Sequence, residues 1–140
     1  MKKLVSGFIA LALFLSLAIG VSAKGPTHGD IYHQIDQANT KIQQDIVQAE
    51  RQANKLLDQY NKSVANTDSQ SAKYAQRTQI YHNHLDQLVT KLLDQTSKIA
   101  SKTEAAAQSQ GITVESFNET VNITGYGQVL VDPIRVVGRN

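Results

Sequence analysis

The residues best suited to chemistry in this chain are its four histidines and a few well-spaced carboxylates. His82 and His84 are two positions apart, so on a helix their side chains diverge by about 200° and cannot bind one metal ion together. His82 and Asp86 share a helix face, but His33 is distant and no third ligand is spaced to join them. We therefore expect solvated histidines and no metal site.

A terminal metal clamp is a second possibility to weigh, because His28 follows the expected export signal closely. A copper or nickel clamp needs histidine at the third position of the mature chain. Cleavage after Ala23 makes His28 the fifth residue. Cleavage after Gly25 would restore the clamp, but it would leave Pro26 directly after the cut, which is unfavourable. The sequence argues against this site.

The remaining polar residues do not form a recognisable catalytic set. The serines lack the Gly-x-Ser-x-Gly context of a nucleophile, and there is no glycine-rich phosphate loop. Asp86, Asp94 and Glu104 have the spacing of exposed helix residues. Asn118 and Asn122 begin glycosylation patterns, which matter only where the source glycosylates exported proteins. We expect no catalytic residue, no cofactor-binding residue and no enzyme activity.

The elements that would position these residues are indicated by an eleven-residue apolar repeat that begins at Ile31. Eleven residues fill three helical turns, so the repeat forms a narrow, nearly straight seam along one helix. Such a seam favours contact with another helix. Its three rows are Ile31, Ile42, Ala53 and Val64; Ile35, Ile46 and Leu57; and Ala38, Ala49 and Tyr60.

A second helical pattern follows a polar stretch near residues 66–71, and Gly111 ends it. We expect Asp30 to cap the first helix. Folding back at residues 66–71 makes the two seams face each other in constant register, with Tyr60 opposite Thr78 and Ala49 opposite Leu88. The alternative is one continuous helix that pairs between chains. The second seam comprises Tyr74, Thr78, Tyr81, Leu85, Leu88, Leu92, Thr96, Ile99, Thr103 and Ala106.

After Gly111 the apolar period changes from helical to alternating, which is typical of short strands. Gly125-Tyr126-Gly127 predicts a tight reversal and Asp132-Pro133 a second turn. Strands this short are not stable alone in water. We expect them to pack on the second helix or to extend a β-sheet of a partner protein. The second helix has four apolar residues outside the seam that the strands could cover: Ile80, Val89, Leu93 and Ala100.

The N-terminal residues have the pattern of an export signal. Lys2 and Lys3 precede an apolar run over 4–19, and Val21-Ser22-Ala23 fits a cleavage site. An uncleaved membrane anchor is the alternative, which Gly20 and the Gly25-Pro26 pair disfavour. The organisation expected is a signal peptide over 1–23, a flexible leader over 24–30, a helical hairpin over 31–110 and a short β-strand segment over 111–140.

Composition limits the partners that this chain can have. Its formal charge of +2 comes from Lys2 and Lys3, so the exported part is neutral and makes a poor nucleic-acid partner. The absence of cysteine excludes disulfides and thiolate metal sites. The seam is rich in alanine and bordered by glutamine, whereas helices that lie on membranes need bulky apolar and cationic residues.

We therefore expect a mainly α protein, an elongated two-helix antiparallel hairpin with a small C-terminal β segment. Its expected function is that of a secreted, non-catalytic structural or protein-interaction protein that self-associates. The working residues would be the seam, the off-seam apolar set and the strand edge at 129–131. The alternatives are an extracytoplasmic holdase-type chaperone and a lipid-binding helical protein at the membrane surface.

The seam makes one direct prediction about stability. Ile46→Asp should lower helix content sharply, because it places a charge where the seam excludes water. Circular dichroism measures this effect, and a melting curve identical to that of the unchanged protein would show that Ile46 is exposed.

Overall fold

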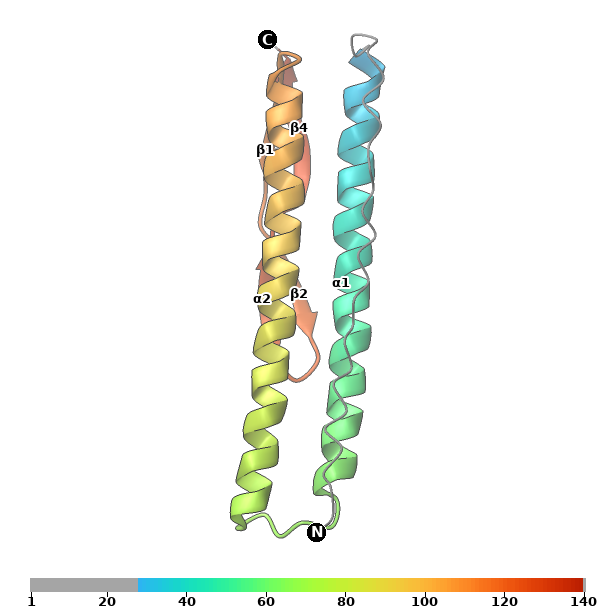
Figure 1. Cartoon of the computed structure of the whole chain (residues 1–140). Coiled ribbons are helices and arrows are strands. Elements are labelled where there is room, and N and C mark those ends of the chain that lie inside the picture. Colours follow the sequence, from blue (N-terminus) through green and yellow to red (C-terminus); the bar gives the residue numbers. More distant parts are fainter. Residues whose placement is uncertain (1–27, 140) are drawn as a thin grey trace, which may run out of the picture.

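The computed structural model describes residues 28–139, and they form a rod of two long helices with strands along one side (Figure 1). Helix α1 (His28–Val64) runs antiparallel to α2 (Ala72–Gln108), and both contact each other along their length. The expected fold, a mainly α helical hairpin with a small β part, is confirmed. The expected signal peptide and residues 24–27 of the expected leader lie outside the described residues.

The helix ends follow from local capping chemistry. Helix α1 begins three residues before the expected start, so Asp30 lies within its first turn. There its negative carboxylate interacts favourably with the positive end of the helix dipole. Ser71 caps α2 by accepting a hydrogen bond from the Tyr74 amide at 3.2 Å. Gly111, just after α2, has a positive φ of 70° that a residue with a side chain rarely adopts.

The two helices meet through the predicted seam, in the predicted register near the turn. The Tyr60 hydroxyl hydrogen bonds with the Thr78 hydroxyl at 3.0 Å, and the Tyr60 ring stacks on Tyr81 with centroids 4.6 Å apart. Ile31 and Ile42 are fully buried. The hairpin is therefore formed within one chain, and the seam that suggested a helical partner is filled by the chain itself.

The C-terminal residues form one long antiparallel ribbon with a single reversal. Its strands are β1 (Ile112–Ser116), β2 (Glu119–Ile123), β3 (Gly127–Val131) and β4 (Ile134–Arg139), of which β1 pairs with β4 and β2 with β3. The Phe117 amide donates to the Pro133 carbonyl at 3.0 Å, so the pairing continues across the gap between the two halves. The predicted reversal at 125–127 is confirmed, with positive φ at Gly125 and Gly127.

The predicted turn at Asp132-Pro133 is wrong, because the chain continues in the same ribbon there. In the half formed by β1 and β4, β1 contacts α2 and β4 contacts α1. In the half formed by β2 and β3, β2 contacts α1 and β3 contacts α2. The ribbon therefore twists over between its two halves, so that each of its two chain segments passes from one helix to the other. Proline has no amide hydrogen to donate, so it fits where the regular ladder is interrupted.

The ribbon supplies much of the cover that the off-seam apolar residues need. Val89 is buried in one core cluster with Ile123, Val129 and Val131 of the ribbon, and Ala100 in a second with Ile112 and Ile134. Ile80 and Leu93 stay exposed, at 46% and 37%. The helices continue beyond the ribbon's reversal toward the connection at 65–71 (Figure 1), so this end of the rod is a bare helix pair.

The reversal of the ribbon packs closely on α2 where Gly125 meets Tyr81. A Cβ atom at Gly125 would overlap the Tyr81 hydroxyl and lie 3.2 Å from its Cζ. That hydroxyl is buried without a hydrogen-bond partner among the described residues. Glycine at this position therefore serves two needs at once, the positive φ of the turn and the close approach of the tyrosine.

We expect Gly125→Ala to lower the free energy of unfolding by about 2–3 kcal/mol, because it adds overpacking to backbone strain. Gly127→Ala is a matched control: its φ is also positive, but no atom lies within 4 Å of the added methyl. Denaturant unfolding of both variants measures the difference. Adding Tyr81→Phe to Gly125→Ala should recover part of the loss, and equal losses for both glycine variants would contradict the packing explanation.

Candidate interaction surfaces

The histidines and carboxylates considered for chemistry stay apart in the structure. His33 Nε2 forms a hydrogen bond with Gln37 Nε2 at 2.9 Å. The ring centroids of His82 and Tyr81 lie 5.6 Å apart. Within residues 28–139 no three side chains of the metal-binding types converge. The side chain of His28 lies outside the described part of the chain.

A cluster of tyrosines near the end of the rod forms the main group of perturbed side chains. Hydrogen bonds lower the pKa of Tyr60, first the bond with Thr78 and then the bond with Tyr74. The same Tyr60–Tyr74 bond raises the pKa of Tyr74. Burial raises the pKa of Tyr81. The Tyr60 hydroxyl bonds to the hydroxyls of Tyr74 and Thr78, so these three residues join the two helices.

Arg77 strengthens the same end of the hairpin. Its guanidinium donates to the Ser63 carbonyl near the end of α1 and to the Thr67 hydroxyl at 2.7 Å. A cation at the C-terminus of a helix also complements its dipole. The sequence pattern of apolar residues contains no signal for this contact.

The first candidate surface is the outward side of the ribbon. Val129 and Val131 face the helices and are buried, whereas Leu130 between them is 55% exposed. Val137 on β4 is 49% exposed. The strand edge predicted at 129–131 is thus divided: its valines belong to the core, and Leu130 is the residue available to a partner. We call Leu130, its strand neighbour Thr120, Val137 and the pair Glu115 and Arg135 the ribbon face.

The position of this ribbon face depends on one asparagine of α1. Asn39 donates from Nδ2 to the Ile134 carbonyl at 2.8 Å and accepts from the Ile134 amide at 2.9 Å. The side chain thereby satisfies both backbone groups of Ile134, as a neighbouring strand would. Sequence reasoning missed this contact, because Asn39 stands among other polar residues and its partner is 95 residues away.

One ion pair links strands β1 and β4 of the ribbon. Glu115 and Arg135, which face each other across β1 and β4, form an ion pair with a 2.7 Å hydrogen bond from Arg135 Nε. The Arg135 guanidinium also lies 5.5 Å from the centroid of Phe117. Opposite charges at facing positions stabilise an antiparallel pair modestly.

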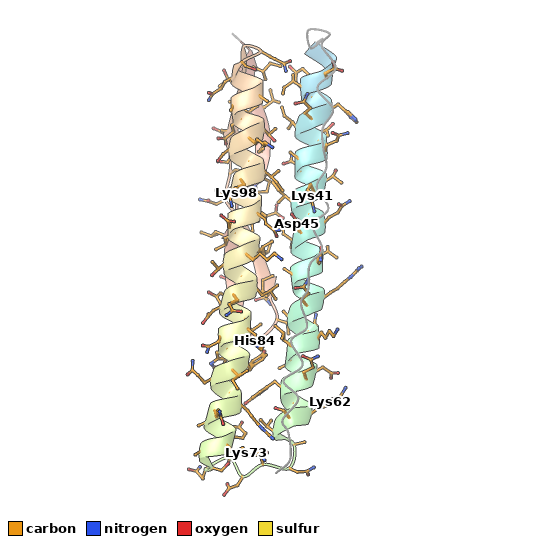
Figure 2. The ribbon with its side chains drawn as sticks, in the orientation of Figure 1. Lys41, Asp45, Lys62, Lys73, His84 and Lys98 are labelled. Carbon is orange, nitrogen blue, oxygen red and sulfur yellow. The ribbon has the colours of Figure 1, made fainter. Side chains whose placement is uncertain are left out.

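The second candidate surface is a groove between the helices on the opposite side of the rod. It has a volume of about 440 Å³ and a floor that includes Ala49, Leu88 and Leu92. Figure 2 shows Lys41, Asp45 and Lys98 on this side, with the strands behind the helices. We call it the helical groove. Its rim carries lysine and glutamine: Lys41, Gln48, Gln52, Lys91, Gln95 and Lys98.

The charge of the helical groove is positive after its ion pairs are considered. Lys41 bonds with Asp45, which is 9% exposed, and Lys98 bonds with Asp94 at 2.7 Å. Lys91 is exposed and forms no ion pair within residues 28–139. The groove therefore presents an apolar floor with an uncompensated ammonium group beside it.

We expect Asn39→Ala to lower the free energy of unfolding by about 1–3 kcal/mol, because the amide and carbonyl of Ile134 both lose their partner. Asn54→Ala is the control on the same helix, since the Asn54 side chain only donates to the Glu50 carbonyl one turn away at 3.0 Å. Thermal or denaturant unfolding compares the two. Equal stability of the two variants would show that solvent replaces the Asn39 contact without loss.

Comparison with known proteins does not add to these surfaces. The chain matches no family model, no curated protein and no solved structure. Neither helix of the described region has the length and apolar content that crossing a membrane requires.

Proposed function

We propose that this protein is an exported, non-catalytic structural or interaction protein that associates with copies of itself. The observation that carries the proposal is the exposure of Leu130 and Val137 on the ribbon face. Apolar side chains on the outward side of a two-stranded ribbon favour association, because contact removes them from water. The strands also have backbone edges without a strand partner in residues 28–139.

The proposal moves the contact away from the helical seam. Seam residues of α1 such as Ile42 and Ala53 are fully buried against the chain's own second helix and ribbon, so another molecule cannot reach them. Ala49, Leu88 and Leu92 are the seam residues at the base of the helical groove. Export is supported by Lys2 and Lys3 before the apolar run and by the small residues of Val21-Ser22-Ala23.

Sedimentation of the mature protein over a range of concentrations tests this function. We expect the mean mass to rise with concentration, and Leu130→Asp to weaken the association about tenfold or more, because it introduces a charge into an apolar contact. Val47→Asp is the matched control, since Val47 is exposed to a similar degree, 48%, but belongs to α1 and to neither the ribbon face nor the helical groove.

Two results would contradict the proposal. A compact monomer at every concentration would exclude self-association. An equal weakening by Leu130→Asp and Val47→Asp would show that the ribbon face is not the contact. Circular dichroism of both variants checks that the fold is kept.

A further inference from the structure

The two candidate surfaces lie back to back at the same level of the rod. The helical groove extends over residues 41–52 of α1 and 88–99 of α2. The ribbon packs on the other side of the same stretch, where Ile42, Ile46 and Leu92 share a core cluster with Val131. A second copy placed on the groove without sliding or rotation would therefore bring its ribbon face over the groove.

The charges of the two sides are complementary. The ribbon side carries acidic groups: Glu50 accepts a hydrogen bond from Thr124, Glu119 accepts one from Gln43, and Asp132 lies in the gap between β3 and β4. None of these three forms an ion pair in the described region. The groove side carries Lys91, which forms no ion pair in the described region.

Apolar groups are also present on both sides. Leu88 is partly exposed at the base of the groove, above the buried Ala49 and Leu92, and the ribbon face offers Leu130 at the same level of the rod. Glutamine side chains on the rim can donate to and accept from the free backbone edges of a ribbon. A groove with an apolar floor and a polar rim is suited to an elongated protein segment with apolar side chains along its centre.

We propose that the helical groove of one copy binds the ribbon face of a second copy, so that molecules stack one upon another. This inference rests on the proposed self-association and names its two surfaces. Since the two surfaces differ, the contact is heterologous and each added copy leaves a new groove and a new ribbon face free. The assembly is therefore open-ended, and it does not stop at a dimer.

Charge reversal tests the contact on the intact mature protein. We expect added salt to weaken association, and Lys91→Glu to weaken it about tenfold or more, because the variant places two acidic groups against each other. Lys55→Glu makes the same charge change at an exposed lysine that lines neither groove, and it should have little effect. Combining Lys91→Glu with Asp132→Lys should restore at least part of the association.

Crosslinking gives a second readout that does not depend on charge. The chain has no cysteine, so single cysteines can be introduced at chosen positions. A mixture of Gln95→Cys and Thr120→Cys should form disulfide-linked heterodimers, and a chain carrying both should form a ladder of oligomers. Val47→Cys mixed with Thr120→Cys is the control, since Val47 lies away from the groove.

The outcomes separate this inference from the proposed function. Association that responds equally to Lys91→Glu and Lys55→Glu, or that stops at a dimer, overturns the stacked contact while self-association stands. A monomer at all concentrations overturns both. A monomer that binds vesicles of anionic lipid, with binding lost in Lys91→Glu, overturns the second copy as the occupant of the groove.

Discussion

The structure depends on a third layer that covers a thin helical seam. Two helices whose facing residues include alanines and threonines bury little apolar surface per layer, and fixing each residue costs about 1–2 kcal/mol of conformational entropy. The ribbon adds isoleucines and valines over the same stretch, such as Ile123 and Ile134, and converts a helix pair into a core with three sides. The ribbon in turn is too short to be stable alone. Each part therefore requires the other.

Much of this fold could be predicted from the order of the residues. Apolar residues at helical spacing locate both helices, and their constant register anticipates the contact between Tyr60 and Thr78. Glycines locate the reversal of the ribbon. The sequence also shows that the apolar residues change from even-numbered positions, Ile112 and Val114, to odd-numbered positions, Val121 and Ile123. This change marks the point where the ribbon twists over, which the prediction of a turn at Asp132-Pro133 did not recognise.

The contacts that position the surfaces could not be predicted in this way, because they join single polar residues across long sequence distances. Asn39 has the same local setting as its polar neighbours, and only the three-dimensional arrangement brings it to the backbone of Ile134. The same holds for Tyr81, whose fit against Gly125 depends on how far the ribbon extends along α2. The strand edge at 129–131 was anticipated, but its division into buried valines and an exposed leucine follows from the side of the ribbon that faces the helices.

The bond between Asn39 and Ile134 also bears on the order in which the molecule can be built. A chain synthesised from its N-terminus presents α1 first, and the partner of Asn39 emerges 95 residues later. Contacts of such high sequence separation form late and slowly. Until the final strand is present, the apolar side of α1 has no complete cover, so the full structure forms only when the C-terminal residues are available.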